Sequence, residues 1–127
     1  AYLVEGMPSI TADSFSATKQ DEDMLKRSLQ FALWTLEAHQ DWSSKALQAE
    51  LKQLADSMDI KIRDLLSPLF IAISGRSVSP PLFDSMVILG PDMTRARVRH
   101  ALNTLGGVSK KQAKRLDSEY RTLQGGS

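Results

Sequence analysis

The stretch GRSVSPPLF, residues 75–83, is the most informative part of this 127-residue chain, because its pattern predicts an abrupt corner between two helical segments. Gly75 suits the left-handed residue that ends a helix, since glycine has no Cβ to clash in that conformation. Ser79 followed by Pro80 suits a helix start, because a serine oxygen accepts from free N–H groups and proline tolerates the first helical position. The pattern therefore predicts two helix ends that meet at one corner, with Arg76 between them.

Helical periodicity extends outward from this corner in both directions. Apolar residues recur three and four positions apart, and no window alternates with the period of a strand. Residues 1–20 lack such a period and indicate an irregular entry segment with at most a short turn of helix. The sequence thus predicts an all-α bundle of about six helices, at approximately 21–39, 44–58, 61–74, 80–89, 93–105 and 110–123.

Local signals refine these boundaries. Ser43 or Ser44 is expected to cap the second helix, and Ser109 with Gln112 forms the pattern of a capping box before the last. Pro68 lies inside the third helix and is expected to kink or divide it, because proline has no backbone N–H.

Composition indicates one globular domain. Hydrophobic residues make up 42% of the chain and charged residues 24%, which is ordinary for a folded protein. The absence of cysteine excludes disulfides and thiolate chemistry and fits a reducing compartment. The sequence contains no apolar run of membrane-spanning length and no signal-peptide pattern, so we expect a cytoplasmic protein with no membrane partner.

Charge is distributed unevenly along the chain. Residues 1–60 carry five Lys or Arg and ten Asp or Glu, whereas residues 61–127 carry eleven and five. We therefore distinguish an acidic helical part (1–60), a basic part (61–105), and a C-terminal helix with a flexible end (106–127). The gradient indicates a polyanionic partner on one face, and a solvated charge distribution is the alternative.

Residues for catalysis or metal binding are not apparent. His39 and His100 fall in separate helices and lack metal-ligand spacing with any carboxylate. The sequence has no nucleophile elbow, phosphate-binding loop or dinucleotide fingerprint. We expect no catalytic residue, no metal and no cofactor in this chain.

Several motifs together resemble one family. PLFIAISGR (68–76), SPPLF (79–83) and ILG (88–90), with residues 97–102 and the earlier DWS (41–43), are similar to the C-terminal anticodon-binding region of bacterial glutamyl-tRNA synthetases. The resemblance covers roughly residues 41–102. It implies a superhelical, all-α anticodon-binding domain whose partners are tRNA(Glu) and the catalytic domain of the same enzyme.

The same resemblance sets the expected chemistry. Those enzymes are class I ligases that attach glutamate to tRNA with ATP and Mg²⁺ in an N-terminal Rossmann domain. Its His-Ile-Gly-His-like and Lys-Met-Ser-Lys-Ser-like signatures are absent here, so this chain is expected to be inactive alone.

The family resemblance also implies which residues contact RNA. Ser79, Pro80, Leu82 and Phe83 correspond to a segment that lies against the anticodon bases. Single-stranded RNA bases are bound by stacking and edge hydrogen bonds, which an apolar corner with free backbone groups can supply. The alternatives are a helix cap for Ser79 and core packing for Leu82 and Phe83.

Cations near the corner are candidates for contacts with phosphates. Arg76 follows the glycine at the corner, and its guanidinium either binds RNA or is a surface charge. Arg95 and Arg99 share one helix face at i, i+4, whereas Arg97 points elsewhere. Contacts of this kind add affinity and little specificity.

One position departs from the family pattern. Phe70 stands where relatives have an arginine that inspects the last anticodon base. Phenylalanine can stack on a base but cannot donate a hydrogen bond. The resemblance therefore leaves tRNA(Gln) open as a second partner.

A helical protein–protein interaction adaptor is the alternative function. In that case the amphipathic helices beginning at Asp21 and Lys110 would form an apolar groove for a partner. RNA binding weakens steeply with salt, whereas an apolar groove responds little, so salt dependence separates the two hypotheses.

Overall fold

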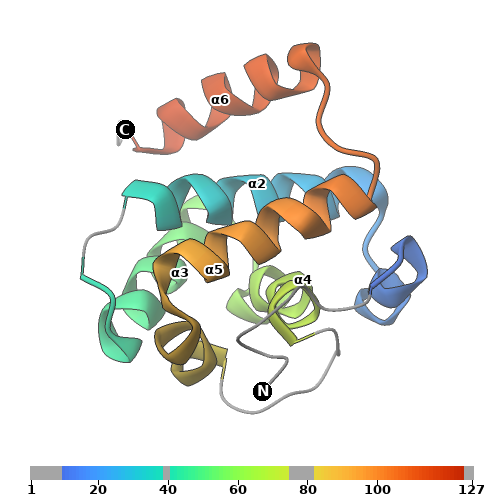
Figure 1. The fold of residues 1–127 in the computed structure, drawn as a ribbon. Coiled ribbons are helices and arrows are strands. Elements are labelled where there is room, and N and C mark those ends of the chain that lie inside the picture. Colours follow the sequence, from blue (N-terminus) through green and yellow to red (C-terminus); the bar gives the residue numbers. More distant parts are fainter. Residues whose placement is uncertain (1–9, 39–40, 75–81, 125–127) are drawn as a thin grey trace.

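The computed structural model describes residues 10–38, 41–74 and 82–124, and within these ranges the fold is all-α, without a strand. The prediction of an all-α protein is confirmed. In Figure 1, α2 and α5 run side by side, α3 and α4 pack below them, and α6 lies above α2. The elements are η1 (Ala12–Thr18, a 3₁₀ helix), α2 (Glu22–Ala38), α3 (Ser44–Met58), α4 (Ile62–Ser74), α5 (Leu82–Thr104) and α6 (Lys110–Gln124).

Helix α5 consists of two helical segments that meet at Gly90. This residue has φ 85° and ψ 166°, a conformation outside the helical region that glycine adopts without a Cβ clash. Pro91 follows and suits the first position of the second segment. The sequence predicted two helices here, at 80–89 and 93–105, and the break at Gly90 matches that division.

Helix α4 is continuous through Pro68, so of the two effects expected of this proline, division of the helix does not occur. Proline at this position cannot donate to the carbonyl four residues earlier, which belongs to Asp64. The side-chain amide of Gln20 donates to that carbonyl oxygen at 2.9 Å. Pro68 itself is buried in the core. A residue far away in sequence thus replaces the missing helical hydrogen bond.

Side-chain caps begin two of the helices as predicted. The Ser43 hydroxyl accepts from the Ala46 backbone N–H at 3.2 Å and starts α3. Ser109 and Gln112 exchange reciprocal hydrogen bonds of 3.1 Å each before α6. These contacts satisfy backbone donors that a helix N-terminus leaves free.

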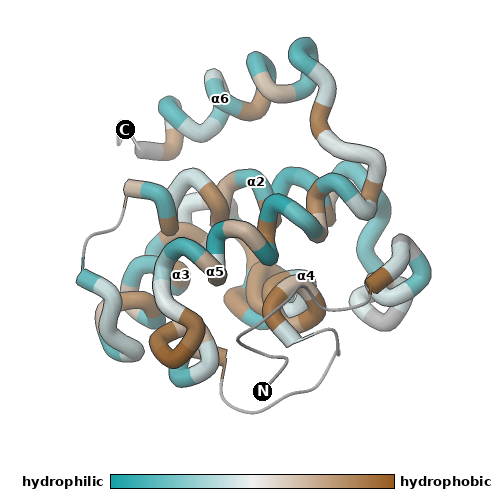
Figure 2. Tube along the Cα trace, in the orientation of Figure 1, coloured by the Kyte–Doolittle hydropathy of each residue, from teal (hydrophilic) through white to brown (hydrophobic). Residues whose placement is uncertain are grey.

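One hydrophobic core holds η1 and the helices together. Side chains from the acidic and the basic parts of the chain contribute to it, because α2 packs against both α4 and α5. In Figure 2, α4 and the first segment of α5 are largely brown, whereas much of α6 is teal. Fully buried core residues include Phe15, Leu29, Leu36, Leu51, Leu69, Met86 and Val98.

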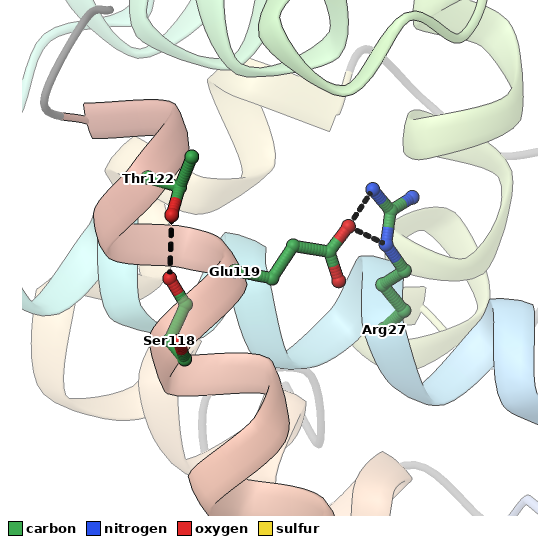
Figure 3. Close-up of polar contacts among 4 residues, drawn as sticks. All are labelled: Arg27, Ser118, Glu119 and Thr122. Carbon is green, nitrogen blue, oxygen red and sulfur yellow. Dashed lines mark hydrogen bonds and ion pairs between the residues drawn. The ribbon is translucent and has the colours of Figure 1, made fainter.

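Helix α6 docks on α2 through one ion pair and one aromatic cluster. Arg27 donates to the Glu119 carboxylate at 2.6 and 3.1 Å, as Figure 3 shows. The Tyr120 ring lies 5.3 Å from those of both Phe31 and Trp34, and its hydroxyl is 2.8 Å from Thr35 Oγ1. Burial raises the pKa of Tyr120, the hydrogen bond with Thr35 lowers it, and the charge of Glu50 raises it. These contacts place α6 at the edge of the bundle opposite the start of α5 (Figure 1).

None of the helices in the described part of the chain is both long and apolar enough to cross a membrane.

Candidate nucleic-acid interface

The predicted site residues fall partly outside the described part of the chain. Arg76, Ser79 and Pro80 lie outside the described residues, as do His39 and the start of the predicted 80–89 helix. Phe70, Leu82, Phe83, Arg95 and Arg99 are described.

Leu82 and Phe83 begin α5 and differ in burial. Leu82 is only 3% exposed and belongs to the core. Phe83 is half-buried and packs against that core with one side. Leu82 is therefore a core residue at the start of α5, whereas Phe83 is only partly buried. On the same segment Ile88, named above only within the ILG motif, is 74% exposed and adds apolar surface.

Phe70 lies one turn before the end of α4 and is half-buried. Its backbone carbonyl accepts a hydrogen bond of 2.7 Å from the Ser74 hydroxyl. This serine thus bonds back to the carbonyl four residues earlier, a local contact within the last turn of the helix.

Arg95 lies over the indole of Trp42. Its guanidinium carbon is 5.9 Å from the ring centroid, and Nη1 is 3.7 Å from a carboxylate oxygen of Asp92. The side chain is 23% exposed, and its Nε has no hydrogen-bond partner among the described residues. A cation held over an aromatic face keeps its outer edge available for an anion.

Trp42 connects this arginine to the first segment of α5. Its Nε1 donates to the Met86 carbonyl at 2.9 Å, and Thr94 Oγ1 donates to the same oxygen at 3.3 Å. Met86 stands one turn after Leu82, so the two donors fix the first segment of α5. In the sequence, Trp42 was recognisable only as part of the DWS motif. Its hydrogen bond to Met86 leaves no local signal, because it links residues far apart in the chain.

Arg99 stands one turn beyond Arg95 on α5. It pairs with Glu37 near the end of α2 at 3.1 Å, and its side chain is 52% exposed. Exposed pairs of this kind contribute between zero and about 1 kcal/mol, so the guanidinium can exchange its partner for a phosphate. Arg95 and Arg99 thus form a row of cations along α5.

Arg97 lies between these two residues in sequence and, as predicted, does not share their face; it points into the protein. It is 1% exposed, and its Nη1 donates to the Ile73 carbonyl at 2.5 Å. Burial lowers the pKa of Arg97 from its usual value. The signal for burial was present, because Thr94, Val98 and Ala101 form an apolar stripe that passes beside this position.

Potential metal ligands do not cluster in this region. Across residues 10–38, 41–74 and 82–124, no three His, Cys, Asp or Glu side chains gather into a possible metal site.

These features are those of an all-α module in which the cations Arg95 and Arg99 line α5 and the aromatic side chains of Phe70 and Phe83 are half-buried. The sequence model of a family described as anticodon binding domain matches residues 1–102. The chain belongs to this family.

Curated relatives extend the match to α6. Glutamate–tRNA ligase from Alcanivorax borkumensis is 49% identical over 123 residues, which cover 97% of this chain and 25% of the relative. The ligase from Marinomonas sp. MWYL1 is 49% identical over 122 residues, covering 96% and 25%. That from Acinetobacter baumannii AYE is 43% identical over 123 residues, covering 97% and 24%. The chain thus spans about a quarter of the length of these relatives.

Proposed function

We propose that this chain is the domain with which a glutamate–tRNA ligase holds the anticodon loop of tRNA(Glu). One observation carries the proposal: an anticodon-binding family covers residues 1–102, and glutamate–tRNA ligases align with nearly the whole chain. The row formed by Arg95 and Arg99 on α5 supports it, because a loop of single-stranded RNA needs cations together with stacking surfaces.

Each side chain has a role that follows from its exposure. Arg95 and Arg99 neutralise phosphates, and the accessible edges of Phe70 and Phe83 offer surfaces for bases. Arg76, Ser79 and Pro80 supply base contacts from the segment between α4 and α5.

The rest of the ligase supplies the chemistry in this proposal. A catalytic domain elsewhere in the protein binds ATP and Mg²⁺ in the cytoplasm and attaches glutamate to the tRNA. Anticodon binding contributes by positioning the tRNA so that its acceptor end reaches the active site.

We also propose that tRNA(Gln) is a substrate of this ligase. Phe70 has no hydrogen-bond donor in its side chain, so it cannot select the last anticodon base by its edge. A Phe70→Arg variant is expected to favour the tRNA(Glu) stem-loop over the tRNA(Gln) stem-loop, whereas the wild type binds both. Equal binding of both stem-loops by the variant would contradict this assignment.

Titration of the chain with anticodon stem-loops at several salt concentrations tests the main proposal. Arg99→Gln is expected to weaken binding and to reduce the slope of log K against log salt by about 0.7, the change for one phosphate contact on a single strand. Lys111→Gln is the matched control, because this exposed cation lies on α6, across the bundle from the start of α5 (Figure 1).

The same titration distinguishes RNA binding from the alternative that the chain is a protein-binding adaptor. A wild-type chain that ignores the stem-loop at low salt, or two variants with equal effects, would contradict the assigned interface. Salt-independent binding of a protein partner would favour the adaptor.

A further inference from the structure

Arg97 is a cation that the fold holds in its interior at the last turn of α4. The side chain comes from α5, is 1% exposed, and donates from Nη1 to the carbonyl oxygen of Ile73. Ile73 is the residue before the end of α4, where the last four carbonyls have no helical donor. Arg97 takes part in a further interaction as well.

Stability alone is a poor reason for an arginine here. Moving a guanidinium out of water costs free energy, and burial lowers the pKa of Arg97 accordingly. Apolar side chains of similar volume are often as stabilising as a buried ion in such a place. What an apolar side chain cannot do is bind a carbonyl and so fix the direction in which a helix ends.

The turn that Arg97 holds carries a proposed RNA contact. Phe70 lies one turn before the end of α4, and its carbonyl is bonded to Ser74 in that same turn. Residues 75–81 continue from this end and include Arg76, Ser79 and Pro80. If a residue that positions a substrate shifts by about 1 Å, the reaction rate can fall about a hundredfold.

We infer that Arg97 is a positioning residue for anticodon binding: it fixes the last turn of α4 and thereby sets the place of Phe70. This inference rests on the proposed function. Arg97 has almost no exposed surface and does not touch RNA itself. Its effect passes through the Ile73 carbonyl, unlike the direct phosphate contacts assigned to Arg95 and Arg99.

The test uses the full-length ligase and tRNA(Glu) transcripts with the native and a substituted anticodon. Arg97→Met keeps the volume and removes the donor. We expect it to raise the KM for native tRNA about tenfold, within the range for removing a charged hydrogen bond, with kcat within about twofold. Arg97→Lys keeps a charged donor on a shorter side chain and is expected to give an intermediate KM. If Arg97→Met does not fold, Arg97→Lys alone still tests whether the guanidinium is needed.

Val98→Ala is the control for a loss of stability alone. Val98 is the next residue on α5, is fully buried, and has no assigned role in binding. We expect this variant to lower the unfolding temperature at least as much as Arg97→Met while leaving KM within about twofold.

Two results would overturn the inference: wild-type KM values in both Arg97 variants, or an equal rise of KM in Val98→Ala. Failure of the proposed function looks different. In that case the wild-type enzyme would not distinguish the native from the substituted anticodon. If the wild type does distinguish them and the Arg97 variants match it, only the positioning role is lost.

Discussion

The side-chain amide nitrogen of Gln20 lies 2.9 Å from the backbone carbonyl oxygen of Asp64, the carbonyl that Pro68 deprives of its helical donor. The two residues are 44 positions apart. Gln20 follows η1, so the contact both repairs α4 and fastens the entry segment to the bundle. Proline is tolerated in this helix because the tertiary structure supplies the missing hydrogen bond.

Replacement of Gln20 by alanine is expected to lower the free energy of unfolding by about 1 kcal/mol, because a partly buried carbonyl loses its donor. Chemical denaturation of the chain measures this change. Gln48→Ala, at an exposed position of α3, is the control and should remain within about 0.5 kcal/mol of the wild type.

A double-mutant cycle tests the causal link to Pro68. In a Pro68→Ala background the backbone N–H of residue 68 can donate to Asp64, so Gln20→Ala should cost less than about half of its wild-type value. Strict additivity of the two substitutions would show that Gln20 does not compensate for the proline.

Trp42→Phe is expected to destabilise the first segment of α5. The substitution keeps the aromatic ring near Arg95 and removes the indole donor to the Met86 carbonyl, for an expected loss of about 1 kcal/mol. Thr94→Val should cost less, because its bond to the same oxygen is longer, 3.3 against 2.9 Å. Thermal unfolding ranks the two variants, and the opposite ranking would argue against Trp42 as the main anchor.

The aromatic cluster should hold α6 more firmly than its ion pair does. Tyr120→Ala removes the contacts with Phe31 and Trp34 and is expected to cost about 2–3 kcal/mol, since a partly buried aromatic ring is lost. Glu119→Gln leaves those rings in place and should cost at most about 1 kcal/mol, because the pair with Arg27 is partly exposed. Fluorescence of Trp34, whose ring lies 5.3 Å from that of Tyr120, reports whether α6 stays docked.

Alkaline pH should loosen the same contact. Burial raises the pKa of Tyr120 in the folded chain. The folded state therefore holds this proton more tightly than the unfolded state. Its contribution is fully present below the ordinary tyrosine pKa of about 10 and is lost as the pH rises through the folded value.

Tyr120→Phe cannot ionise at this position, so its stability should fall less between about pH 9.5 and 11 than that of the wild type. Denaturant titrations at several pH values measure the difference. Parallel pH profiles for the two proteins would contradict a coupling between Tyr120 ionisation and folding.

Glu37→Gln should strengthen RNA binding under the proposed function. Glu37 pairs with Arg99 at 3.1 Å, and removing its charge leaves the guanidinium available to a phosphate. We expect a two- to fivefold rise in affinity for the stem-loop, about 0.4–1 kcal/mol, at low salt. The rise in affinity should vanish in an Arg99→Gln background. If it persists there, it does not arise from the release of Arg99.

The amino-acid pattern alone predicted the helices and most of their ends. Periodicity located the helices, and serine caps fixed the starts of α3 and α6, because these signals act within one turn of the chain. Gly90 also marked the break in α5, because glycine adopts a positive φ without a Cβ clash. The motifs around residues 68–83 also indicated the family that the comparison establishes.

Which polar groups meet across the bundle depends instead on how the helices pack. Gln20 with Asp64, Trp42 with Met86, and Arg97 with Ile73 are each bonds between a side chain and a distant backbone carbonyl. Every residue carries such a carbonyl, so its identity in the sequence does not reveal which one lacks a partner. That depends on where helices end and how they pack, which is why the sequence did not show the partner of the Asp64 carbonyl or the anchoring role of Trp42.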